Sequence, residues 1–240
     1  MSRTEPMSTD TVKGLVSMGV QGVIDKLSPV FERTSGHRLA ITYNTSKMLT
    51  QQLRSGAETD AIIGTRDHMD VLVADGLIAP ASDVALAHSI VGMAVLKGAP
   101  KPDISTPEAF KRTVLAARAI GYSEPAGGGA SGVHFEKLIH QLGIADAVKP
   151  KAKHPPVGTH TADMLLTGEV DLAVQQVAEL NFVTGIELLG PLPEELQHVT
   201  IFVGALHARA RHAAAAKALL AFLRTPESAA AFKAEGLDPV

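Results

Sequence analysis

Short apolar runs alternate with amphipathic helical patterns along most of the chain, and this alternation restricts the fold more than any other feature. We expect strands at residues 12–16, 38–43, 60–64, 90–96, 119–122, 171–174 and 199–205. Between them, apolar residues recur at helical spacing, as Ile24, Leu27 and Phe31 do within residues 21–35. The pattern predicts an α/β fold with mainly parallel strands.

The 240 residues contain no single flexible linker. We expect the chain to cross between two lobes at the strands near residues 90–96 and 199–205. The first lobe would then comprise residues 1–89 and 204–240, and the second lobe residues 90–203. Each lobe would be a mainly parallel sheet flanked by helices, with a ligand cleft between the lobes.

Composition excludes several classes of function. The net charge is −3 without a basic stripe, so nucleic acid is not an expected partner. No apolar run approaches the roughly 20 residues that cross a bilayer, so membrane insertion is not expected. Without cysteine there is no disulfide and no thiolate–metal site. No HExxH or EF-hand pattern occurs, so we expect neither a metal nor a cofactor.

Three turns between a strand and a helix are rich in small polar residues, and they are the candidate anion site. Ligands of parallel α/β sheets bind at the carboxyl ends of strands, where helix N-termini offer free N–H groups to anions. A serine in one such turn is most often only a helix cap, but three turns in one alternating pattern favour a site. The candidate ligand contacts are Ser17, Gly19, Asn44, Thr45, Ser46, Ser123, Gly129, Ala130 and Ser131.

Three segments resemble the periplasmic molybdate-binding protein family, which has the type 2 solute-binding fold. They are residues 15–78, residues 121–144 (GYSEPAGGGASGVHFEKLIHQLGI) and residues 165–180 (LLTGEVDLAVQQVAEL). The resemblance implies two lobes that close on a small anion held by hydroxyls and backbone amides. It assigns hydroxyl donors to Ser17 and Ser46 and amide donors to the region of Ala130 and Ser131. Gln175 lies near the place where the family often has a tyrosine.

Two cations depart from that pattern. Lys47 follows the second polar turn, and Arg66 stands where the family commonly has a small or acidic residue. Arginine binds carboxylates in bidentate fashion. If both side chains face inward, they favour a small carboxylate over molybdate; otherwise they are solvated surface charges.

The fold also resembles that of aconitate isomerase, which implies a proton shift on an allylic tricarboxylate without a cofactor. Such chemistry needs an acid–base group, and histidine is the usual choice near neutral pH. His134 follows the glycine-rich loop directly and is the candidate base. His160 is a second candidate for the site, although most of the ten histidines are expected on the surface.

Three functions remain open from the sequence. The leading hypothesis is a solute-binding protein for a small oxyanion or carboxylate, with an ABC permease as partner if the chain is exported. The alternatives are an isomerase of a small polycarboxylate and a cytoplasmic ligand sensor. Residues 1–13 are polar and lack an apolar leader. We therefore expect a cytoplasmic location for the chain as it stands, or a periplasmic one if a leader was removed.

Overall fold

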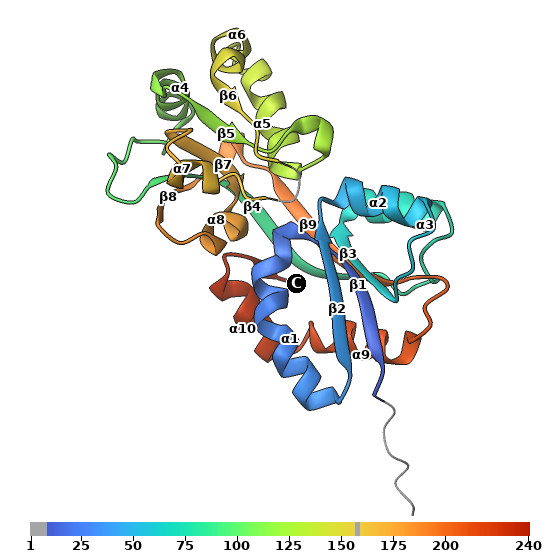
Figure 1. Cartoon of the computed structure of the whole chain (residues 1–240). Coiled ribbons are helices and arrows are strands. Elements are labelled where there is room, and N and C mark those ends of the chain that lie inside the picture. Colours follow the sequence, from blue (N-terminus) through green and yellow to red (C-terminus); the bar gives the residue numbers. More distant parts are fainter. Residues whose placement is uncertain (1–8, 157–158) are drawn as a thin grey trace, which may run out of the picture.

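The computed structural model describes residues 9–156 and 159–240, and their strands pair into a sheet (Figure 1). Within these residues ten strands form one sheet, whose main path runs β2-β1-β3-β9-β4-β7-β5-β6; β8 and β10 pair with β4 beside that path. The strands are β1 (Thr11–Ser17), β2 (Arg38–Asn44), β3 (Ala61–Thr65), β4 (Val84–Leu96), β5 (Ile120–Tyr122), β6 (Ala152–Lys153), β7 (Leu172–Gln176), β8 (Ile186–Pro191), β9 (Val199–Leu206) and β10 (Asp238–Pro239).

Helices connect the strands and cover both faces of the sheet (Figure 1). The α-helices are α1 (Gln21–Ser35), α2 (Ser46–Arg54), α3 (Arg66–Ala74), α4 (Pro107–Ala116), α5 (Ala130–Gln141), α6 (Ala145–Val148), α7 (Asp163–Leu166), α8 (Val177–Phe182), α9 (Ala213–Phe222) and α10 (Pro226–Ala234). The short 3-10 helices are η1 (Met18–Val20), η2 (Pro125–Gly127), η3 (Lys149–Lys151) and η4 (Glu194–Leu196).

The first lobe is a sheet with a separate apolar core on each face. β1 pairs in parallel with β2 and β3, and β3 pairs antiparallel with β9. On one face Val23 and Phe31 of α1 pack with Leu219 of α9. On the other face Leu49 of α2 packs with Leu72 of α3. The helices on each face therefore bury the side chains that alternate along the strands between them.

The second lobe repeats this construction. β5 pairs in parallel with β6 and β7. Alternate residues of β7 enter different cores: Leu172 packs with Phe110 of α4 and Phe135 of α5, whereas Ala173 packs with Leu180 of α8. Each lobe has its own buried cores, and the two-lobed α/β fold predicted from the sequence is confirmed.

One long strand, β4, belongs to both lobes. Its residues from Val84 to Ile90 pair with β9, and those from Val91 to Leu96 pair with β7 and β8. At the change of partner, the Gln197 side chain accepts a hydrogen bond from the Val91 N–H (2.8 Å) and donates one to the Val91 carbonyl (3.0 Å). The Gln197 amide thus satisfies backbone groups at the position where the lobes join.

The return crossing was expected at the strand near residues 199–205, which is β9. β9 pairs along its length with β3 and β4 of the first lobe, so the predicted boundary between residues 203 and 204 lies inside this strand. The chain leaves the second lobe after β8, between residues 191 and 199. β4 also begins at Val84 rather than at residue 90. Its first part, VALAHS, contains three alanine or serine residues that carry little strand signal, and pairing with β9 makes it a strand.

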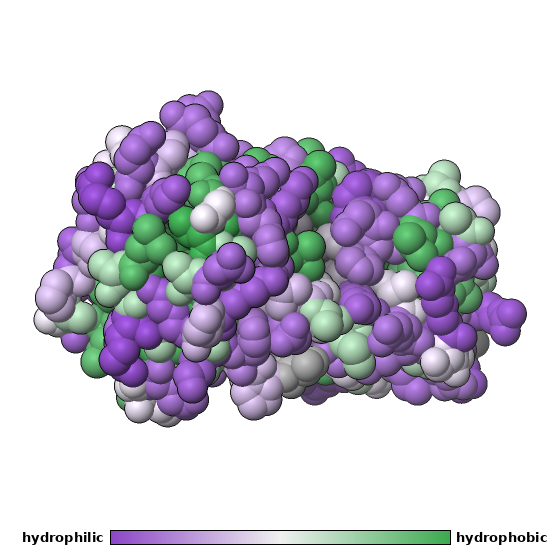
Figure 2. Space-filling model, turned by 90° about the horizontal axis from the view of Figure 1, so that it is seen from above, coloured by the Kyte–Doolittle hydropathy of each residue, from purple (hydrophilic) through white to green (hydrophobic). Residues whose placement is uncertain are grey.

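Hydrophilic residues cover most of the face seen in Figure 2, where hydrophobic residues form separate patches. Within residues 9–156 and 159–240, every helix is too short or too polar to cross a bilayer.

Gly132 fixes the contact between α5 and the loop after β5. A Cβ atom at this position would lie 2.0 Å from the Ser123 carbonyl oxygen, which is backbone and cannot move independently. We expect Gly132→Ala to destabilise the chain by about 1–3 kcal/mol, as overpacking does in other proteins. Urea unfolding checks this. Val133→Ala, at the exposed neighbouring position, is the control and should change stability little; equal effects of both variants would contradict the prediction.

Candidate functional site

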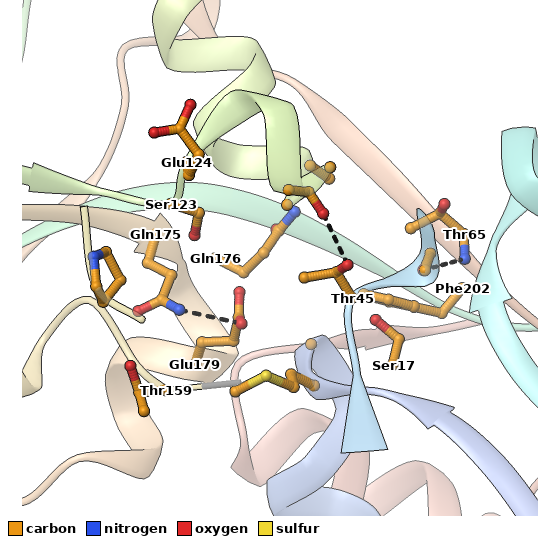
Figure 3. A pocket seen from close by; sticks show the side chains of 18 of the residues that line it. Ser17, Thr45, Thr65, Ser123, Glu124, Thr159, Gln175, Gln176, Glu179 and Phe202 are labelled. Atoms are coloured by element: carbon orange, nitrogen blue, oxygen red, sulfur yellow. Dashed lines mark hydrogen bonds between the residues drawn. The ribbon is translucent and has the colours of Figure 1, made fainter. Parts of the chain in front are cut away.

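A cavity between the lobes collects residues from the carboxyl ends of five strands (Figure 3). The first lobe contributes the ends of β1, β2 and β3, and the second lobe those of β5 and β7. The cavity volume is about 60 Å³. It is lined by Ser17, Met18, Gly19, Thr45, Ser46, Thr65, Ser123, Glu124, Gly127, Gly128, Gly129, Ala130, Pro155, Pro156, Thr159, Gln175, Gln176, Glu179 and Phe202.

Hydroxyl groups line the wall formed by the first lobe. Ser17 ends β1 and is almost fully buried. Ser46 begins α2, and its hydroxyl accepts a hydrogen bond from the Thr65 N–H (3.1 Å). The Ser46 O–H proton is therefore available to a ligand. Gly19 is needed because a Cβ there would lie 2.3 Å from the ring of Phe202.

Two side chains of the first lobe bridge to the glycine-rich loop of the second. Thr45 caps α2 and donates a hydrogen bond to the Gly127 carbonyl (2.8 Å). Lys47 donates from Nζ to the Ala126 carbonyl (2.6 Å). Gly128 has a φ of +75°, and a Cβ there would lie 2.4 Å from Cβ of Lys47, so only glycine fits. These contacts hold the lobes together beside the cavity.

Two buried glutamines form the floor at the end of β7, and their amides have fixed partners. Gln175 accepts from the Thr161 N–H (2.9 Å) and donates to Glu179 Oε1 (3.1 Å). Gln176 accepts from the Ser89 hydroxyl (2.7 Å) and donates to the Thr200 hydroxyl (2.9 Å). Because Ser89 and Thr200 lie on β4 and β9, Gln176 connects the cavity to the strands that join the lobes.

Glu179 is an acid of the cavity whose pKa departs strongly from its ordinary value. Its carboxyl group extends into the space between Gln175, Gln176 and Ser17 (Figure 3). Burial raises the pKa of Glu179 to about 7, although hydrogen bonds from the Gln175 side chain and the Gln176 backbone N–H oppose the rise. Near neutral pH this group can therefore both take up and release a proton.

Cations do not line this cavity in the described part of the chain, so of the two alternatives left open for Lys47 and Arg66 the structure does not have the inward-facing one. Arg66 forms ion pairs with Asp70 (3.2 Å) and Asp83 (2.9 Å), and these partners raise its pKa. Lys47 is held at the Ala126 carbonyl. Both side chains lie in a neighbouring groove. Hydroxyl and amide groups line the cavity instead, together with the carboxyls of Glu124 and Glu179.

His134 also lies outside the cavity, in the same groove as Arg66. It is one helical turn beyond Ala130, about 6 Å further along α5. Its Nε2 is 2.8 Å from the Leu196 carbonyl, and its ring stacks on His198 at 5.1 Å. The His134 ring therefore lies in the groove and not among the residues that line the cavity.

The other predicted residues divide into two groups. Ser131 is buried within α5, His160 packs against the Phe182 ring (4.8 Å), and Asn44 accepts a hydrogen bond from the Thr45 N–H (2.9 Å); none of these three lines the cavity. Eight predicted residues do line it: Ser17, Gly19, Thr45, Ser46, Ser123, Gly129, Ala130 and Gln175. Their roles as ligand contacts remain predictions.

Sequence reasoning missed Thr65 and Glu179 as site residues, and each had a signal. Thr65 ends a buried strand, as Ser17 does, so the rule applied to the other turns also covers it. Glu179 is the third residue of α8, after Gln176 at the N-cap position. A glutamate at this position commonly reaches back to the cap N–H, which turns its carboxyl toward the end of the preceding strand.

Glu179 makes the stability of the chain depend on pH. The pKa of this carboxyl is 4.5 in the unfolded chain and about 7 in the folded chain, so the folded chain binds the proton more tightly. Protonation of Glu179 therefore stabilises the folded chain. This contribution is fully present below pH 4.5 and is lost as the pH rises through 7. We expect Glu179→Gln to increase the free energy of unfolding at pH 8 by up to about 3 kcal/mol, with little change at pH 4.5.

Urea unfolding at both pH values measures this effect, with Glu194→Gln at an exposed position of η4 as the control. The prediction would be contradicted if the free energy of unfolding changed equally between the two pH values in wild type and in Glu179→Gln.

Comparison with known proteins identifies the family. Residues 12–238 match the family of bacterial extracellular solute-binding proteins. Aconitate isomerase of Pseudomonas sp. is 34% identical over an alignment 242 residues long. The alignment covers 98% of this chain and 90% of that protein.

Two solved structures share the fold. The periplasmic molybdate-binding protein of Azotobacter vinelandii has a TM-score of 0.78 at 16% identity and covers 94% of this chain and 98% of its own. The sulfate-binding protein SubI of Mycobacterium tuberculosis has a TM-score of 0.73 at 17% identity and covers 97% of this chain and 88% of its own. The resemblance inferred from the sequence is thereby confirmed, and the chain belongs to the bacterial extracellular solute-binding protein family.

Proposed function

We propose that the chain is an isomerase that holds a small polycarboxylate between its lobes and moves a proton on it. The observation that carries this proposal is Glu179, a carboxyl in the cavity whose pKa is about 7. The relation to aconitate isomerase over 98% of the chain supports the reaction class. In a site that only binds an anion, a carboxyl that can ionise would weaken binding, because the two negative charges repel each other.

The donors of the cavity suit a carboxylate that accumulates charge during a proton shift. Ser17 and Ser46 offer hydroxyl protons, and α2 and α5 begin at the cavity and present backbone N–H groups there. Neutral donors fixed in a cavity stabilise negative charge as it develops in the transition state.

In the proposed reaction, ionised Glu179 takes a proton from an allylic carbon of the substrate. The C–H electron pair becomes a new C=C bond, and charge spreads onto the carboxylate oxygens. The electron pair of the former C=C bond then takes the proton back from Glu179 at the far carbon. One C–H bond breaks, one forms, and the double bond moves by one carbon.

Transport is the second candidate. The cavity of about 60 Å³ in this closed arrangement and its neutral donors suit a compact oxyanion, and the A. vinelandii neighbour is a molybdate-binding protein. In that case an ABC permease would be the partner of this chain. A compact ligand would fit the closed lobes, whereas a tricarboxylate requires wider separation during binding.

Exchange in deuterated water tests the isomerase directly. With trans-aconitate as substrate, wild type should form cis-aconitate and incorporate deuterium, both visible by NMR. Glu179→Gln should slow both processes at least about 100-fold, the usual contribution of an acid–base group. His134→Ala should react like wild type because the His134 ring lies outside the cavity.

Equal rates in wild type and Glu179→Gln would remove Glu179 from the mechanism. No turnover in wild type, together with a higher melting temperature in molybdate or sulfate, would favour transport instead.

The pH dependence of the rate gives a second test. Because the reaction begins from ionised Glu179, we expect kcat/KM to fall about tenfold per pH unit below a midpoint near 7. A bound polyanion disfavours ionised Glu179, so the midpoint of kcat should lie at higher pH than that of kcat/KM. Steady-state rates between pH 5 and 9 measure both, and a flat profile across this range would contradict the assignment.

A further inference from the structure

The Gln175 side chain can adopt only one useful orientation. Its Oε1 lies 2.9 Å from the Thr161 N–H. Its Nε2 lies 3.1 Å from the Glu179 carboxyl (Figure 3). A backbone N–H can only donate, so the amide oxygen must face Thr161 and the NH₂ group must face Glu179. Gln175 is only 1% exposed, which leaves no room for the amide to exchange these partners with water.

We propose that Gln175 is the positioning residue for proton transfer by Glu179, fixed by the backbone of Thr161 and directing one hydrogen bond to Oε1 of the carboxyl. The inference rests on the proposed function, because it gives Gln175 a role through Glu179 and not as a contact to the reacting carbon. The Gln175 hydrogen bond to Oε1 restrains how the Glu179 carboxyl lies toward the cavity.

The neighbouring glutamine provides a contrast. The Gln176 side chain bonds to Ser89 and Thr200, so only its backbone N–H acts on Glu179. Within residues 9–156 and 159–240, Gln175 is therefore the side-chain donor to this carboxyl. A hydrogen bond to the ionised form favours ionisation, and it opposes the effect of burial. Removing it should leave Glu179 protonated over a wider pH range.

Substitution of Gln175 tests this role. Gln175→Leu keeps a similar volume but cannot donate, and we expect the pKa of Glu179 to rise by about one unit. The carboxyl is followed without substrate by NMR of protein containing ¹³C-labelled glutamate, with its signal assigned by its absence in Glu179→Gln. The midpoint of kcat/KM for trans-aconitate should move upward by the same amount.

Two further variants make the result decisive. Gln175→Glu replaces the donor by a second acid and should raise the pKa of Glu179 more than leucine does, which keeps the test available if Gln175→Leu does not fold. Gln141→Leu, at an exposed position of α5, is the matched control and should leave both midpoints unchanged.

If the pKa of Glu179 is unchanged in folded Gln175→Leu, the proposal is overturned. It is also overturned if the pKa shifts but the midpoint of kcat/KM does not, in a chain that turns over trans-aconitate. A shifted titration in a chain that does not isomerise trans-aconitate would instead overturn the proposed function and support the effect of Gln175 on Glu179. The two failures are thus distinguishable.

Discussion

The continuous pairing of β4 with both lobes is the constraint on which the rest of the structure depends. Because β4 exchanges β9 for β7 and β8 between Ile90 and Val91, one sheet continues from the first lobe into the second, and loops of both lobes line the cavity. The Gln197 amide supports that exchange at Val91, and Gln176 reaches from the cavity floor to Ser89 on the same strand. Hydrogen bonds therefore fix the position of the cavity relative to the strand that both lobes share.

The chemistry of the cavity follows from an imbalance of charge. Its described lining contains hydroxyls, amides and two glutamates, while Arg66 and Lys47 form their bonds in a neighbouring groove. Burying a carboxyl without a cation disfavours its ionised form. This arrangement destabilises the folded chain at high pH, where Glu179 is ionised. It also places the pKa of Glu179 near 7, where proton transfer in both directions is efficient.

The contacts between the lobes join the two walls of the cavity. Thr45 caps α2 and also bonds to Gly127, so the residue that orders this helix N-terminus also holds the opposite lobe. Lys47 adds a second bond, and Gly128 permits the close approach. A ligand at the cavity would meet the N-termini of α2 and α5 together only when these contacts are formed.

The sequence by itself determined the two-lobed α/β fold, the strand-to-helix turns and eight residues that line the cavity. Local periodicity and turn chemistry suffice there, because the carboxyl ends of parallel strands gather at one edge wherever the strands lie. Tertiary structure alone decided which charged groups line the cavity. Arg66 turns to Asp83, 17 residues away, and His134 turns to Leu196, 62 residues away. Glu179 is half-buried and lines the cavity, and no cation among the described residues lines it. Such partners are set by packing between distant segments, and the pKa of Glu179 follows from its burial there, which no local pattern encodes.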